Sequence, residues 1–136
     1  MNYLLDVNVL LAWGWADHAD HRRAASWIAS MKRKRATMLL TSAIPELGFV
    51  RVSVQRAQGR VAVGDAVATL ASMLGSLGAC HDFLPDDRSS STGFPDWCSG
   101  ASSTTDAHLF ALAKAHGAML ATMGGGIPGA MLLPQP

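Results

Sequence analysis

The sequence has few charged residues and no excess of either sign. Asp, Glu, Lys and Arg make up 15% of its 136 residues, whereas they form about a quarter of an average soluble domain. The formal net charge is +1, so the strongly basic composition that usually accompanies nucleic-acid binding is missing. Composition alone therefore gives no argument for a nucleic-acid partner, and it leaves open a protein that meets RNA through a metal site and a local basic patch.

Cysteines, targeting segments and long apolar runs are also scarce. Cys80 and Cys98 are the only two cysteines, too few and too badly spaced for a zinc site, and they suit a reducing compartment. We expect Cys80, in an apolar run, to act as a small buried hydrophobe. The apolar N-terminus has no basic region before it and is interrupted by Asp6, which excludes a signal peptide. No run approaches the ~20 apolar residues of a membrane span, so we expect a cytoplasmic protein without membrane contact.

What the sequence does have is enough apolar material for a core. Hydrophobic residues make up 49% of the chain, and the length fits a single domain over residues 1–136. A chain this apolar and this sparsely charged either hides surface in an oligomer or expects a partner.

Short continuous apolar runs recur along the chain and are typical of parallel strands covered on both faces. Between them, apolar residues recur at helical spacing. The predicted strands cover residues 3–5, 38–40, 80–84, 119–121 and 131–133. The predicted helices present Ala24, Trp27, Ile28 and Met31; Ile44, Leu47, Val50 and Val54; Val67, Leu70, Leu74 and Leu77; and Leu109, Leu112 and Ala113.

Polar residues mark the helix ends. Ser42, Asp65 and Thr105 are candidate N-caps, and Gly117 is a candidate terminator. The alternation of strands and helices predicts an α/β sandwich with a mainly parallel sheet. Residues 86–104, rich in Ser, Thr and Gly, are expected to form a mobile surface loop, or else a lid or partner-binding loop, an alternative that Phe94 and Trp97 keep open.

Three acidic residues should collect at one edge of this sheet. Asp6 closes the first strand, Glu46 lies in the first turn of the helix after the second, and Asp106 opens the helix before the fourth. Strand C-termini and the N-termini of the returning helices share an edge in an open parallel sheet, and ligands bind there. Each acid alone could simply cap a turn or favour a helix start. Together they predict a divalent-metal site, because converging carboxylates repel one another unless a cation lies among them.

The chemistry of such a site follows from its ligands. Oxygen-only donors select hard ions, Mg²⁺ or Mn²⁺, over zinc. A divalent ion held there can activate water and stabilise charge on a phosphate, and the neighbouring helix N-termini favour an anionic substrate.

Four blocks, in order along the chain, resemble PIN-domain proteins and especially VapC-type toxins. They are residues 1–11 (MNYLLDVNVLL), 41–47 (TSAIPEL), 105–109 (TDAHL, followed by Leu112 and Ala113) and 120–122 (LAT), so the resemblance runs from Met1 to about Gly126.

The resemblance implies a three-layer α/β/α, PIN-like fold and a Mg²⁺- or Mn²⁺-dependent endoribonuclease. It also implies the toxin of a type II toxin–antitoxin pair, a homodimer that a small antitoxin protein neutralises. Asp6 and Asp106 would be the principal metal ligands, and Glu46 would complete the catalytic cluster or act through water. Asn8, Ser42 and Thr105 would be supporting polar groups.

One position departs from the family pattern. A fourth acid usually follows the strand that ends here at Thr122, but this chain continues Met123-Gly124-Gly125-Gly126. Water, Thr122 or Asn8 could fill the gap, since Mg²⁺ keeps several waters. The alternative is a catalytically impaired PIN-like module that binds protein or RNA without cleavage.

Other residues admit a functional and a plain interpretation. The basic run 32–35 is either a solvated helix end or, with Arg51 and Arg56, an RNA-backbone contact. His108 should point away from Asp106 on a helix. A phosphoacceptor domain of the response-regulator type is a third hypothesis, but it wants a lysine at a strand end, and Lys114 falls within a predicted helix.

Overall fold

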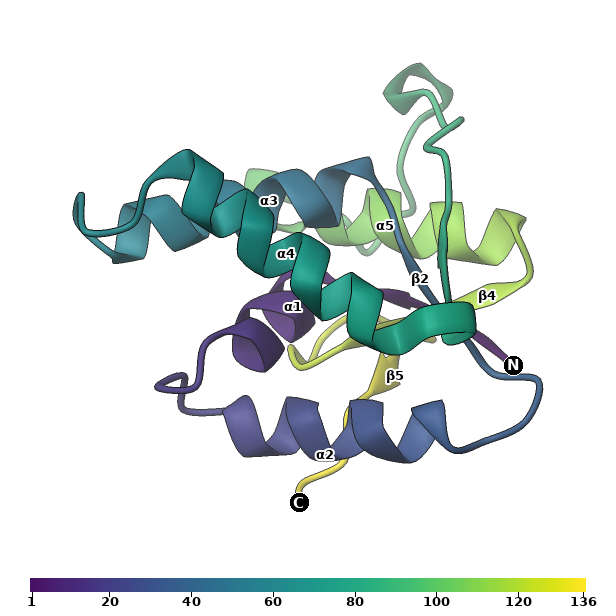
Figure 1. Cartoon of the computed structure of the whole chain (residues 1–136). Helices are drawn as coiled ribbons and strands as arrows, with labels where there is room; N and C mark the ends of the chain where they lie inside the picture. The colour runs from purple at the N-terminus through teal and green to yellow at the C-terminus, as the bar shows by residue number, and fades with distance from the viewer.

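The computed structural model describes all residues from Met1 to Pro136. Figure 1 shows strands and helices alternating along the chain. The strands are β1 (Asn2–Leu5), β2 (Met38–Thr41), β3 (His81–Phe83), β4 (Ala118–Thr122) and β5 (Met131–Leu132). The helices are α1 (Val7–Gly14), α2 (His21–Lys32), α3 (Ala43–Arg56), α4 (Val63–Leu77) and α5 (Thr104–Ala115).

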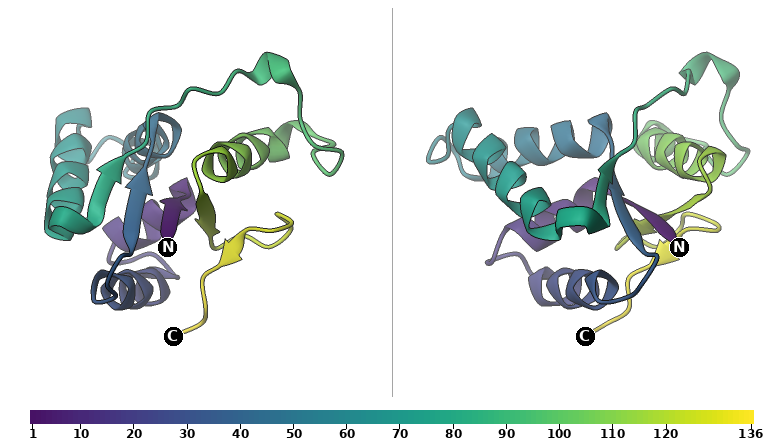
Figure 2. Two further views of the ribbon diagram at one scale, coloured as in Figure 1. Left: turned by 90° about the vertical axis from the view of Figure 1, so that its right-hand side faces the viewer. Right: turned by 45° about the vertical axis from the view of Figure 1, so that its right-hand side comes forward.

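The strands form one sheet in the order β3-β2-β1-β4-β5, and every neighbouring pair is parallel. Leu4 pairs with Leu40 on one side and with Leu120 on the other. Figure 2 shows α5 on one side of the strands and the other four helices on the opposite side. The predicted three-layer α/β/α fold is confirmed, and each predicted strand is present with its ends shifted by two residues or fewer.

Two cores, one on each face of the sheet, follow from the two-residue period of strands. Leu5, Leu39 and Ala121 belong to the larger core, which α1, α2, α3 and α4 cover. Leu4, Leu40 and Leu120 belong to the smaller core, where Leu109, Leu112 and Ala113 of α5 pack against them. The predicted inward faces of α2 and α5 are therefore confirmed, and they explain why these strands read as unbroken apolar runs.

Helix α1 was not predicted. Val9, Leu10 and Ala12 are buried and Leu11, Trp13 and Trp15 pack against the same core. A helix apolar on nearly every side carries no period of 3.6 to recognise. The indole of Trp15 also donates to Ser53 Oγ over 2.9 Å, so Trp13 and Trp15 serve packing within this chain.

The predicted apolar faces of α3 and α4 are partly wrong. Helix α3 buries Pro45, Phe49 and Ser53, whereas Ile44 is 37% and Leu47 67% exposed. Helix α4 buries Ala66, Leu70 and Leu77, but its Val67 is 50% exposed. Both helices are apolar on more than one side, so spacing alone could not tell which side meets the sheet.

Two of the predicted caps are also displaced. Helix α4 begins after Ala62, and Asp65 lies inside its first turn, where its carboxylate accepts from the Ala62 amide over 3.1 Å. Helix α5 is capped by Ser103 and already includes Thr105. Ser42 does occupy the N-cap position of α3, and Gly117 takes the left-handed conformation (φ 68°) just after α5.

One segment contradicts the expectation that no run approaches a membrane span. Val63–Cys80 reaches a mean hydropathy of 1.4 over 18 residues, and 17% of that window is buried. By length and composition this segment could cross a membrane. The same test is passed by core helices of soluble proteins, and here Ala66, Leu70 and Leu77 pack into the domain.

Candidate functional site

Asp6 stands at the carboxyl end of the central strand. Its amide donates to Ala121 O of β4, and its side chain caps α1 by accepting from the Val7 amide over 2.7 Å. The hydroxyl of Thr122 donates to its other carboxylate oxygen, Oδ2, over 2.9 Å. Asp6 is only 2% exposed, so these hydrogen bonds hold its carboxyl group in a fixed position at the edge of the sheet.

Asp106 is the second acid at this edge. It lies in the first turn of α5 and is partly buried. Its charge lies close enough to Asp6 to raise the pKa of the Asp6 carboxyl, although burial of Asp6 is the larger cause. Burial likewise raises the pKa of Asp106. Asp6 and Asp106 therefore share this edge of the sheet, and no Lys or Arg forms an ion pair with either of them.

Glu46 is held differently. In the first turn of α3, its Oε2 accepts from the hydroxyl of Thr41, the last residue of β2, over 2.5 Å. Thr41 Oγ1 lies 2.7 Å from His81 Nε2. Because the single hydroxyl hydrogen of Thr41 goes to Glu46, His81 Nε2 must donate to Thr41. A chain of hydrogen bonds thus runs from β3 through β2 to Glu46.

The structure does not gather all three acids at metal-binding distance: no group of three or more His, Cys, Asp or Glu side chains is placed to hold a metal ion. The site consists of Asp6 and Asp106 at the shared edge, and Glu46 is hydrogen-bonded to Thr41. Sequence reasoning did not identify Thr41 or His81 as partners of Glu46. Their only sequence signal was a polar residue at the end of one apolar run and another at the start of the next.

The position of the missing fourth acid adjoins the pair. Asn8 Nδ2 lies 3.4 Å from Thr122 Oγ1, and its Oδ1 accepts from the Met123 amide over 3.4 Å. A Cβ at Gly124 would lie 3.7 Å from Asn8 Nδ2 and 3.9 Å from Thr122 Oγ1. Asn8 and Gly124 therefore both lie next to Thr122, the residue that donates to Asp6.

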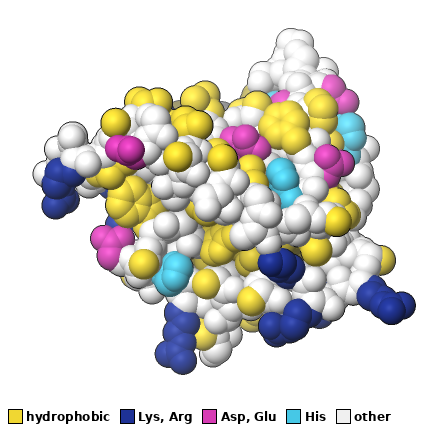
Figure 3. Space-filling view, in the orientation of Figure 1, with side chains coloured by type: hydrophobic (Ala, Val, Ile, Leu, Met, Phe, Trp, Pro, Cys, Tyr) yellow, Lys and Arg dark blue, Asp and Glu magenta, His cyan; other side chains and the backbone are white.

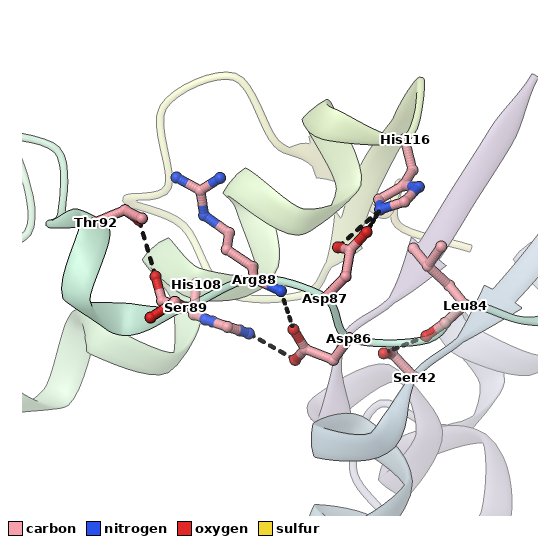
Figure 4. Close-up of polar contacts among 9 residues, drawn as sticks. All are labelled: Ser42, Leu84, Asp86, Asp87, Arg88, Ser89, Thr92, His108 and His116. Atoms are coloured by element: carbon pink, nitrogen blue, oxygen red, sulfur yellow. Dashed lines mark hydrogen bonds and ion pairs between the residues drawn. The ribbon is translucent and has the colours of Figure 1, made fainter.

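The two remaining predicted supporting residues lie farther out. The Ser42 hydroxyl is fully buried and donates to Leu84 O over 2.6 Å (Figure 4), so it holds the segment after β3. Thr105 is exposed on the first turn of α5.

The donors at this edge fit a hard divalent cation. Asp6 and Asp106 offer carboxylate oxygens, and Thr122 and Asn8 add neutral polar groups. Burial raises the pKa of both carboxyls, and a bound cation would favour their charged forms. Two carboxylates with water completing the shell are a usual arrangement for Mg²⁺.

The basic run lies at the opposite edge. Residues 32–35 end α2 and lead into the amino end of β2, where Met38 N donates to Met1 O. In Figure 3, Lys and Arg side chains line the lower edge of the molecule, over α2. Arg56 lies 4.5 Å from the Trp15 ring and pairs with Asp17 at 3.4 Å. These residues are therefore placed to contact solvent and the protein rather than a phosphate held by Asp6 and Asp106.

The histidines are engaged within the chain. His108 Nε2 lies 2.6 Å from Asp86 Oδ2, and His116 Nε2 lies 3.0 Å from Asp87 Oδ1 (Figure 4). His21 Nδ1 lies 2.8 Å from Ala12 O, and the Asp20 amide donates to His18 Nδ1 over 3.0 Å. His108 does turn away from Asp106, as its spacing predicted. Lys114 is exposed on α5, which leaves the phosphoacceptor hypothesis without its lysine.

Known proteins resemble this chain along most of its length. Ribonuclease VapC39 of Mycobacterium tuberculosis is 39% identical over 127 residues, a match covering 90% of this chain and 88% of that protein. Ribonuclease VapC38 of the same organism is 35% identical, covering 91% and 86%. Ribonuclease VapC29 is 32% identical, covering 93% and 89%. No family model matches the chain.

Proposed function

The chain belongs to the VapC family of PIN-domain ribonucleases, and from that premise we propose that it is a metal-dependent endoribonuclease whose site is built on Asp6 and Asp106. The observation that carries the proposal is this pair of acids: Asp6 is buried and Asp106 partly buried at one edge of the sheet, both carboxyls have raised pKa values, and no Lys or Arg is paired with either. The ribonuclease names of the relatives do not favour the alternative, a PIN-like module without cleavage.

The ion proposed for this site is Mg²⁺ or Mn²⁺. Asp6 and Asp106 would hold it, because oxygen donors suit hard cations. Such an ion would stabilise the charge on a phosphate as a Lewis acid, and it would lower the pKa of a bound water toward neutrality.

The protein side chains orient this site. The Thr122 hydroxyl occupies one lone pair of Asp6 Oδ2, and the Val7 amide occupies the other oxygen, so the remaining lone pairs of Asp6 have fixed directions. Glu46, aligned by Thr41, is proposed to orient water or the phosphate rather than to bind the ion directly. The N-termini of α1, α3 and α5 reach this edge and add partial positive charge for an anionic RNA backbone.

The proposed partners are a small antitoxin protein and a second copy of the chain. Their support is the apolar surface that the fold leaves uncovered on α3 and α4, where Leu47 and Val63 are 67% and 58% exposed. Figure 3 shows hydrophobic side chains spread over this part of the molecule. Exposed apolar surface of this kind marks interaction sites. In the cytoplasm, the antitoxin or the second copy of the chain would cover it.

The experiment that tests this function is RNA cleavage by the purified, antitoxin-free protein with Mn²⁺ or Mg²⁺, with EDTA as control and Asp6→Asn beside it. We expect cleavage that needs metal and is lost in the variant. Metal-dependent cleavage that Asp6→Asn leaves unchanged would refute the assignment of the site, and no cleavage of any RNA pool would return the binding module to first place.

A further inference from the structure

A cavity of about 450 Å³ lies between α5 and the connection that leads to it from β3. We name this connection, residues 84–103, the strap; Figure 2 shows it arching away from the sheet over α5. The cavity wall combines two cationic side chains, Arg88 and Lys114, with two aromatic ones, Phe94 and Phe110, and with the hydroxyl of Ser89. Cations beside aromatic rings are the combination that holds single-stranded nucleic acid.

The first half of the strap is fixed on α5 by hydrogen bonds. His108 and His116 of α5 contact Asp86 and Asp87, and the Arg88 amide donates to Asp86 Oδ1 over 3.2 Å (Figure 4). The Leu84 amide donates to Thr41 O over 2.7 Å. The cavity is therefore bounded by an anchored segment.

The cationic side chains of the cavity are not paired with the nearby acids. The two nearby acids, Asp86 and Asp87, are each engaged by a histidine. In contrast, the side chains of Arg88 and Lys114 form no ion pair within the chain, and Figure 4 shows the guanidinium of Arg88 extended without a hydrogen-bond partner. Two unpaired cations, one from the strap and one from α5, suit an anionic group such as a phosphate.

The cavity adjoins a second hollow, which is lined by residues next in sequence to the candidate site. A neighbouring hollow of about 370 Å³ shares Ser90, Phe94 and His108 with it. The far side of that hollow is formed by Ile44, Thr104 and Thr105. Thr105 directly precedes Asp106, and Ile44 lies two residues before Glu46. Phe94 therefore borders both hollows and lies between the residues next to the acids and the two cations.

We propose that this cavity is a subsite for one nucleotide of a single-stranded RNA, next to the one that is cut. Phe94, 43% exposed, stacks on the base, and Arg88 and Lys114 contact the phosphate. Phe110 is held edge-on by Trp97, with ring centroids 6.3 Å apart, and forms the floor. The assignment rests on the proposed ribonuclease function, because it names where that RNA continues beyond the acids.

The test separates binding from cleavage. Binding of a short fluorescent RNA of randomised sequence is measured by anisotropy in EDTA over a series of salt concentrations, for the whole protein and for Arg88→Ala, Lys114→Ala and Phe94→Leu. Each cation removed should lower the slope of log K against log salt by about 0.7, the value for one phosphate contact on a single strand. Phe94→Leu should weaken binding about tenfold without changing the slope, as loss of one stacked base does. Arg22→Ala, an exposed arginine on α2, is the matched control and should change neither.

Cleavage kinetics with Mn²⁺ provide the second readout. The three subsite variants should raise KM with little change in kcat, since they remove binding distant from the acids. RNA affinity and salt slope equal to those of Arg22→Ala would overturn the subsite, even in a protein that cleaves RNA. Altered oligomeric state in Phe94→Leu with unaltered RNA binding would also overturn it, because the cavity would then be a protein interface. If the wild type binds RNA through these residues but never cleaves it, the proposed function fails and the subsite stands.

Discussion

Asp6 and Glu46 follow neighbouring strands of one sheet, yet the fold treats the two carboxylates in opposite ways. Asp6 is buried beside a second acid, with a raised pKa and no cationic partner. Glu46 accepts a hydrogen bond from Thr41, which is aligned in turn by His81. The comparison teaches that a row of acids at a sheet edge is not one site. Asp6 also accepts hydrogen bonds, from Thr122 and the Val7 amide, but burial and the nearby Asp106 still raise its pKa, whereas Glu46 is bound to Thr41 apart from a second acid.

The largest loss of RNA cleavage should come from changing Asp6 or Asp106, the two acids without a cationic partner. Asp106→Asn removes one of the two charges proposed to hold the ion and keeps the shape of the side chain. We expect RNA cleavage to fall by more than about a hundredfold, because even residues behind metal ligands cost 10–100-fold when changed. Cleavage rates at saturating Mn²⁺ measure this. A loss under about threefold would contradict the pairing of Asp106 with Asp6.

Adding a carboxylate next to Asp6 and Asp106 should strengthen metal binding. Gly124→Asp places a carboxylate beside Asn8 and Thr122, where a Cβ meets nothing closer than 3.7 Å and the backbone does not have a positive φ. We expect Mn²⁺ to bind about tenfold more tightly, roughly 1.4 kcal/mol, by calorimetry. Gly125→Asp, one residue away with open space around its Cβ, is the control. Equal gains in both variants would show a general effect of negative charge.

On the Glu46 side, the hydrogen-bonded chain should act as one unit. Thr41→Val and Glu46→Gln should each lower kcat about tenfold, the smaller end of the range for supporting partners. The kcat of the double variant should be no lower than that of the more impaired single variant, because the effects of coupled residues do not add. Thr37→Val, a buried threonine just before the same strand, is the control. Additive losses would mean that Glu46 does not work through Thr41.

The smallest expected effect is on the pH dependence of stabilisation by Mn²⁺, which should depend on Asp6 and Asp106. A carboxyl whose pKa is raised in the folded protein destabilises the metal-free fold above that pKa, and this cost disappears as pH falls through it toward the unfolded value. The cation offsets the cost only while Asp6 and Asp106 are ionised. The rise in Tm caused by Mn²⁺ should therefore shrink on acidification sooner than ordinary aspartates would predict. In Asp6→Asn, a small rise independent of pH is expected; the wild-type profile in that variant would contradict the account.

Much of the fold could be predicted because parallel strands buried on both faces leave unbroken apolar runs, and the edge shared by Asp6 and Asp106 follows from topology. The inward side of α3 could not, since Ile44 and Leu47 are as apolar as the buried Phe49. The orientation of the Glu46 side chain could not be predicted either. It depends on a hydrogen bond to Thr41, whose own orientation depends on His81, forty residues later. Contacts of that kind leave no periodic pattern in a sequence.

The central claim is that Asp6 and Asp106 hold a divalent ion although the fourth acid is absent. The most direct measurement is a Mn²⁺ titration of the purified, antitoxin-free protein by calorimetry, wild type beside Asp6→Asn. We expect saturable binding in the wild type that disappears in the variant. Binding that persists unchanged in Asp6→Asn, or no binding to the wild type at millimolar metal, would contradict it.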